Sequence, residues 1–136
     1  MGSVLSCLLS QSFTIHGLWP SQQTNRYYGK FNFDLFKGKA LLQEMYSYWP
    51  PQPKIGGFSH FLWEFEWEKN GNRYADIMME LAPANFMMYG IKNRNEQLQV
   101  YYFTKTIELY KQLNVRKIPK RTYTKGEFST LTKIPQ

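Results

Sequence analysis

Apolar residues along the chain follow patterns that predict one short strand and three helices. Residues 12–16 are rich in strand-forming side chains, and Gly17 directly after them is expected to end the strand. Apolar positions recur at helical spacing in three later segments, at about residues 39–48, 60–69 and 96–113. Four large aromatic side chains crowd the second of these helices, so much of its surface is expected to be buried: Phe61, Trp63, Phe65 and Trp67.

The length and composition of the chain favour one globular domain. The chain has 136 residues, of which 43% are hydrophobic and 20% are charged, which suits a single packed core rather than a disordered segment. No internal repeat divides it, and no run of about 18 apolar residues predicts a transmembrane helix. We expect an N-terminal segment over 1–11 that is truncated or poorly ordered, a domain over 12–125, and a C-terminal tail over 126–136.

The charge of the chain favours an anionic partner. The formal net charge is +7, which is typical of proteins that bind RNA, an acidic protein or a membrane surface. Six basic residues and one acidic residue lie between Arg116 and Lys133. Such a run is also typical of a solvated tail, so it does not identify a binding surface by itself.

The N-terminal residues leave the cellular location open. Cys7 is the single cysteine, so no intramolecular disulfide forms and folding does not require an oxidising compartment. Gly2 and Cys7 fit a short pattern for N-myristoylation with a second acyl group nearby, and we expect membrane contact only if they are acylated. The alternative is a truncated or poorly ordered terminus, and no secretory signal peptide is evident.

Two segments carry residues suited to proton transfer and to binding an anion. His16 ends the predicted strand beside a glycine, and histidine is the side chain best suited to proton transfer near neutral pH. Glu66 and Asn70 are four residues apart on the predicted helix, as are Phe65 and Lys69, so all four are expected on or near one helical face. Taken singly, a histidine at a strand end is more often structural, and a Glu–Lys pair on a helix is more often a surface ion pair.

Together, the two segments resemble the active-site motifs of the ribonuclease T2 family. The segment 13–20, which contains His16, Gly17 and Trp19, is similar to the first motif, and the segment 63–71 is similar to the second. The resemblance extends more loosely over about residues 12–125. It implies an α+β fold, an antiparallel β-sheet with packed helices, truncated at the N-terminus at the first strand and also at the C-terminus.

The resemblance also implies a chemistry. Members of the family cleave single-stranded RNA without a metal: the ribose 2′-hydroxyl attacks the adjacent phosphate and leaves a 2′,3′-cyclic phosphate. It places a catalytic histidine at His16 and support for the charged transition state at Glu66 and Lys69. It places base stacking at Trp19 and at one of two neighbouring tyrosines, Tyr27 or Tyr28. No metal and no cofactor is expected.

Two substitutions in the second motif remove family histidines. Phe65 stands where the family carries a phosphate-binding histidine, and Asn70 stands where it carries the partner catalytic histidine. Because asparagine does not exchange a proton near neutral pH, cleavage is expected to fall by a minimum of about three orders of magnitude. His60 is the other histidine of the chain, and it lies five residues before Phe65, which is expected to rotate it away from Asn70.

Further departures concern the frame of the domain. Arg73 stands where the family usually has a disulfide cysteine, and nothing in residues 1–11 resembles the family's first strand. Loss of that strand would expose a sheet edge, so either the chain is a fragment or a partner chain covers the gap. The family is mainly secreted or vacuolar, but the single cysteine argues against assuming that location here.

Three hypotheses for function follow from these features. The first is a ribonuclease T2-like RNA-binding domain with impaired endoribonuclease activity. The second is an active or weakly active metal-independent endoribonuclease, in which Glu66 or His60 takes over the lost role. The third is a non-enzymatic structural or assembly subunit whose aromatic surface contacts protein.

Overall fold

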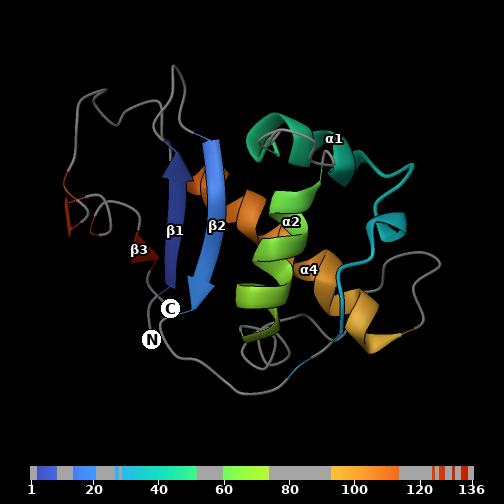
Figure 1. Cartoon of the computed structure of the whole chain (residues 1–136). Helices are drawn as coiled ribbons and strands as arrows, with labels where there is room; N and C mark the ends of the chain where they lie inside the picture. The colour runs from blue at the N-terminus through green and yellow to red at the C-terminus, as the bar shows by residue number, and fades with distance from the viewer. Residues whose placement is uncertain are drawn as a thin grey trace.

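A computed structural model describes residues 3–8, 14–20, 27, 29–51, 60–73, 93–113, 124, 126–127, 130 and 133–134. Within these residues a small sheet stands beside a group of helices (Figure 1). The strands are β1 (Ser3–Leu8), β2 (Thr14–Pro20) and β3 (Lys133–Ile134). The helices are α1 (Ala40–Tyr48), α2 (Phe61–Glu66) and α4 (Arg94–Gln112), together with the 3-10 turn η1 (Phe33–Leu35) and the π-helical turn η2 (Trp67–Gly71). The mixture is of the α+β class, as predicted.

The three strands pair antiparallel in the order β2-β1-β3. β1 runs alongside all of β2, from Ser3 opposite Pro20 to Leu8 opposite Thr14. The structure therefore differs from the expectation that the first segment of the chain supplies no strand. Strand pairing depends on backbone N–H and C=O groups, so these residues pair without the family's side-chain motif. The bounds of the domain and truncation at either end remain predictions.

β2 continues through the glycine that was expected to end it. Gly17 pairs with Ser6 and Ile15 pairs with Cys7, so His16 is an extra residue in β2 and the ladder is irregular there. This is a β-bulge, which bends a strand locally and is common beside active sites. The expectation that Gly17 ends the strand is wrong, because a glycine inside a strand often marks a bulge or a close approach.

The predicted helices are present, and the second one is longer than expected. α1 and α4 match the predicted helices at 39–48 and 96–113 within two residues at each end. α2 passes directly into η2, and the helical backbone continues to Arg73. η2 contacts both β2 and α4, so this second helix is the element that joins the sheet to the long helix.

Aromatic side chains form most of the core. The largest fully buried side chains include three tryptophans and two more aromatic residues that contact them: Trp49, Trp63, Trp67, Tyr102 and Phe103. Polar groups of these rings find partners inside the core. The Trp63 indole donates to the Trp49 carbonyl at 2.7 Å, and the Tyr102 hydroxyl donates to the Leu18 carbonyl at 2.9 Å. The second bond ties α4 directly to β2, on the motif that contains His16.

The four aromatic side chains of the second helix form two pairs, one buried and one exposed. Trp63 and Trp67 are fully buried, as predicted, but Phe61 is 48% exposed and Phe65 is 45% exposed. The expectation of burial is wrong for these two residues. They lie on the side of the helix opposite to the core, where the spacing of four residues places them in one row.

Candidate functional site

The carboxylate of Glu66 is the centre of the site that joins the two motifs. Glu66 is only 1% exposed, although it ends α2 with a charged side chain. Its Oε2 atom accepts hydrogen bonds from the Trp19 indole at 3.1 Å and from the Asn70 amide at 2.9 Å. Because a buried carboxylate needs donors to replace water, these bonds stabilise it in place.

Gly17 makes the close approach between the motifs possible. A Cβ atom at this position would lie 2.2 Å from Glu66 Oε2 and 2.6 Å from Glu66 Cδ. Only a residue without a side chain leaves room for the carboxylate here. Glu66 thus packs against the backbone of the residue that follows His16, and the two sequence motifs meet at this contact.

Replacing Gly17 by alanine is expected to lower the free energy of unfolding by about 1–3 kcal/mol, because the new methyl group forces Glu66 out of its hydrogen bonds. Denaturant unfolding measures the change. Gly126→Ala is the matched control, since a Cβ atom there meets nothing within 4 Å. Equal midpoints for Gly17→Ala and the parent protein would contradict the close packing of Glu66 on β2.

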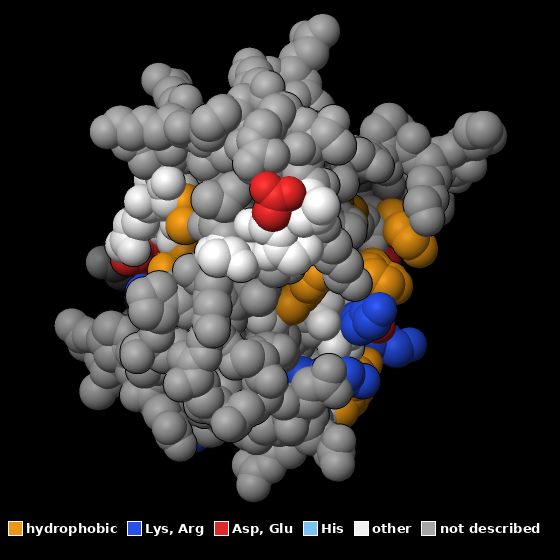
Figure 2. All heavy atoms as spheres, turned by 90° about the vertical axis from the view of Figure 1, so that its left-hand side faces the viewer, with side chains coloured by type: hydrophobic (Ala, Val, Ile, Leu, Met, Phe, Trp, Pro, Cys, Tyr) orange, Lys and Arg blue, Asp and Glu red, His pale blue; other side chains and the backbone are white. Residues whose placement is uncertain are grey.

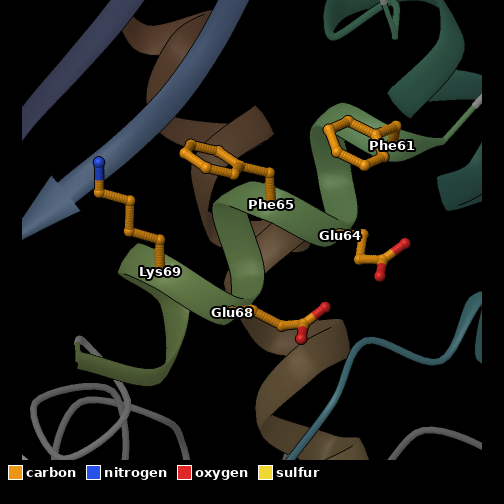
Figure 3. A pocket seen from close by; sticks show the side chains of 5 residues that line it. All are labelled: Phe61, Glu64, Phe65, Glu68 and Lys69. Carbon is orange, nitrogen blue, oxygen red and sulfur yellow. The ribbon is translucent and has the colours of Figure 1, made fainter. Parts of the chain in front are cut away.

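The four residues expected on one helical face divide between two adjoining rows. Glu66 and Asn70 are hydrogen-bonded to each other on the side toward β2. Phe65 and Lys69 lie on the exposed side, with the Lys69 ammonium 5.2 Å from the centre of the Phe65 ring. This is a cation–π contact, and Lys69 extends toward β2 (Figure 3). The prediction of one shared face is therefore too simple, because Glu66 is buried whereas Lys69 is free to meet solvent.

His60 belongs to an aromatic cluster instead of to the Glu66–Asn70 pair. It caps the N-terminus of α2, and its ring stacks on Phe33 at 4.3 Å with an interplanar angle of 10°. Phe31 lies on the same cluster, 6.3 Å from the His60 ring. The Nδ1 atom of His60 is buried and has no hydrogen-bond partner among the residues that the structure describes. The stacking supports a packing role for His60 and gives no support to the idea that it replaces the lost catalytic histidine.

A pair of acidic side chains lies on the outer side of the same helix. Burial raises the pKa of Glu68 above its ordinary value, and the neighbouring carboxylate of Glu64 raises this pKa further. Lys30 and the backbone N–H of Phe31 act in the opposite direction. The outer side of α2 therefore carries negative charge beside the exposed phenylalanines.

The remaining predicted site residues are described in part. Tyr27 is 62% exposed, and Tyr28 lies outside the described residues. The backbone of His16 lies in the β2 bulge, and its side chain is outside the described part. The basic residues from Arg116 to Arg121 and the side chain of Cys7 are also outside it.

No metal site or membrane span is found within the described residues. Among the side chains that the structure describes, no three His, Cys, Asp or Glu residues are grouped as metal ligands. In the same part of the chain, no helix is long and apolar enough to cross a membrane.

Sequence reasoning missed two contacts that hold the site together. The Trp19 indole serves as a donor to Glu66, although the sequence suggested only a stacking role for it. The Tyr102 hydroxyl holds the backbone of Leu18 from across the core. Gly17 was the feature of the sequence that could have indicated the contact between Trp19 and Glu66. The Glu66 carboxylate packs so closely on β2 that the strand needs a residue without a side chain there.

Comparisons with known proteins connect this geometry to one family. Residues 4–132 match the model of the ribonuclease T2 family. Human "Ribonuclease T2" is 32% identical over 108 residues, which covers 78% of this chain and 35% of that protein. The "Ribonuclease T2" of Sus scrofa is 38% identical over 109 residues, which covers 74% of this chain and 42% of that protein. The chain thus spans less than half the length of these relatives.

A solved structure has a similar fold. The crystal structure of human RNase T2 superposes with a TM-score of 0.58 at 22% sequence identity. The alignment covers 96% of this chain and 69% of that chain. At this level of identity the likeness concerns the fold alone.

Proposed function

This chain belongs to the ribonuclease T2 family, and from that premise we propose that it binds single-stranded RNA and cleaves it only weakly. The proposed reaction is a metal-independent transesterification. The ribose 2′-oxygen attacks the adjacent phosphorus, the bond from phosphorus to the 5′-oxygen of the next nucleotide breaks, and the products are a 2′,3′-cyclic phosphate and a 5′-hydroxyl end. His16 is the proposed proton-transfer residue, and Glu66 and Lys69 are proposed to stabilise charge around the phosphate.

The single observation that carries the proposal is the hydrogen bond between Asn70 and Glu66. Asn70 donates its amide N–H to Glu66 Oε2 at 2.9 Å, so this side chain is engaged as a donor at the position where the family has a histidine. An amide neither accepts nor releases a proton near neutral pH. One of the two proton transfers therefore lacks its group, and each such group contributes about 10²–10⁴-fold to the rate.

The geometry around Glu66 supports retention of a binding site. Trp19 is only partly buried and lies beside the Glu66 carboxylate, and its indole is the kind of aromatic surface on which bases stack. Lys69 is exposed and supplies a cation for a phosphate. The net charge of +7 favours RNA over neutral partners. Figure 2 shows Lys and Arg side chains next to hydrophobic ones along one margin of the molecule, a surface that suits a chain of bases and phosphates.

The proposal is tested by incubating the purified protein with single-stranded RNA in EDTA and analysing the new ends. We expect slow cleavage that leaves cyclic phosphates and that disappears in His16→Ala. Turnover that survives His16→Ala would point to a contaminating nuclease. Rapid His16-dependent cleavage would favour an active endoribonuclease, and the absence of both binding and cleavage would favour a structural subunit.

Trp19→Ala is expected to weaken binding of a single-stranded oligonucleotide by about tenfold, because it removes one stacking surface. Trp19→Phe is the matched control. It keeps an aromatic face and loses the N–H bond to Glu66, so it should retain most of the affinity. Fluorescence anisotropy at several salt concentrations measures both. Equal loss in the two variants would assign Trp19 to positioning Glu66 and would contradict a stacking role.

A further inference from the structure

The outer side of α2 and η2 carries a hollow, and most of the residues that line it have no role in the proposed cleavage reaction. Its volume is about 390 Å³, and it is lined by Phe61, Glu64, Phe65, Glu68 and Lys69. Figure 3 shows Phe61, Phe65 and Lys69 following one another along one side of the helix, and Glu64 and Glu68 along the other. The hollow is open to solvent, so a ligand bound there lies along the outer side of the helix instead of being enclosed.

The aromatic side of the hollow suits a flat ligand. Phe61 and Phe65 are each almost half exposed, and large exposed apolar side chains in one row often mark a binding surface. The Lys69 ammonium already lies 5.2 Å from the centre of the Phe65 ring. A cation placed over an aromatic ring can move to an approaching phosphate and leave the ring face to a base.

The acidic side of the hollow suits a ligand that donates hydrogen bonds. Glu64 and Glu68 are four residues apart, and their mutual repulsion contributes to the raised pKa of Glu68. Hydrogen-bond donors placed between these carboxylates would relieve the repulsion. The exocyclic amino groups of cytosine, adenine and guanine are such donors, whereas uracil has no amino group and presents an oxygen where cytosine has one.

We propose that this hollow binds an unpaired nucleotide of the RNA whose base carries an exocyclic amino group. The base stacks on Phe61 and Phe65, its amino group donates to Glu64 or Glu68, and its phosphate meets Lys69. The inference rests on the proposed RNA function and adds a base preference to it: a base with an exocyclic amino group, which is cytosine, adenine or guanine, in preference to uracil. The substitution that removed a family histidine at position 65 is, in this interpretation, also what supplies a stacking surface.

The test uses 2′-O-methyl hexanucleotides of cytosine and of uracil, which bind but cannot be cleaved through the 2′-hydroxyl. We expect the whole chain to bind the cytosine hexamer about tenfold more tightly than the uracil hexamer. Phe61→Ala should reduce the affinity for the cytosine hexamer about tenfold. Tyr46→Ala is the matched control, because it removes a side chain that is 42% exposed and does not line the hollow.

A double variant shows whether Glu64 and Glu68 recognise the base or only repel the negatively charged RNA. Glu64→Ala with Glu68→Ala should raise the affinity for the uracil hexamer, since two negative charges are removed, and should abolish the preference for cytosine. A purely structural role for these carboxylates would leave the ratio of the two affinities unchanged, and that result would overturn the proposal.

Three other results show whether this inference or the proposed function is wrong. Binding that is weakened by Trp19→Ala but unchanged by Phe61→Ala would overturn the proposal that the hollow binds a nucleotide. It would leave the proposed RNA function intact. Failure to bind either hexamer would contradict the RNA function itself. Carboxylate-dependent binding of a hexa-arginine peptide, without any base preference, would overturn the proposal and assign the hollow to a basic protein segment.

Discussion

Phe65→His combined with Asn70→His is expected to raise cleavage of single-stranded RNA by about 10²–10⁴-fold, because it restores a second group that exchanges protons near neutral pH. An imidazole N–H at position 70 can also replace the amide that now donates to Glu66 at 2.9 Å. The rate of appearance of cyclic-phosphate ends measures the gain.

Single substitutions apportion the effect between the two positions. Asn70→His alone should account for most of the gain, since in the proposed mechanism it supplies the second proton-transfer group. Phe65→His alone should change little, because it adds only a phosphate contact to a site with one imidazole. If the double variant folds correctly and cleaves no faster than the parent chain, the absent histidines are not the main defect.

Trp67→Ala is expected to lower the free energy of unfolding by about 3–5 kcal/mol, because it leaves a large cavity in the core. Trp67 is fully buried, packs on Tyr102 at 5.8 Å between ring centres, and donates its indole N–H to the Gly29 carbonyl at 3.0 Å. Denaturant unfolding followed by circular dichroism measures the loss.

Two variants isolate the cause of that loss. Trp67→Phe keeps most of the ring and removes the hydrogen bond to Gly29, so it should cost clearly less than Trp67→Ala. Phe65→Ala, two residues earlier and 45% exposed, should change stability only slightly. A loss at Phe65 as large as the loss at Trp67 would contradict the division of this helix into inner and outer rows.

The sequence predicted the three helices because their apolar residues repeat at helical spacing. It did not predict β1, because Ser3–Leu8 has no distinctive motif and its strand depends on pairing with β2, which is a tertiary contact. Nor did the sequence predict which phenylalanines are exposed. A pattern of apolar residues does not distinguish Phe61 from Trp63. Trp63 faces the core because Tyr46 and Trp49 pack around it, and these are tertiary contacts.

The sequence indicated which residues lie close together at the candidate site, but not which hydrogen bonds they form. Motif resemblance placed Glu66 and Trp19 in one site, and the structure brings them within 3.1 Å of each other. Resemblance did not reveal that Asn70 donates to the same carboxylate oxygen, because the spacing of four residues permits this bond but does not fix the side-chain rotamers that form it. The catalytic and RNA-binding roles remain predictions for the experiments above.

The extra residue in β2 also fixes the inside–outside parity of that strand. Strict alternation would place Ile15 and Leu18 on opposite faces of the sheet because they are three positions apart, yet both are fully buried in the same core cluster. One unpaired residue between them resets the alternation. Shortening the strand by that residue would turn one of its halves inside out, so either Ile15 or Leu18 would leave the core. The length of this motif is therefore constrained by packing, independently of any chemistry that its histidine performs.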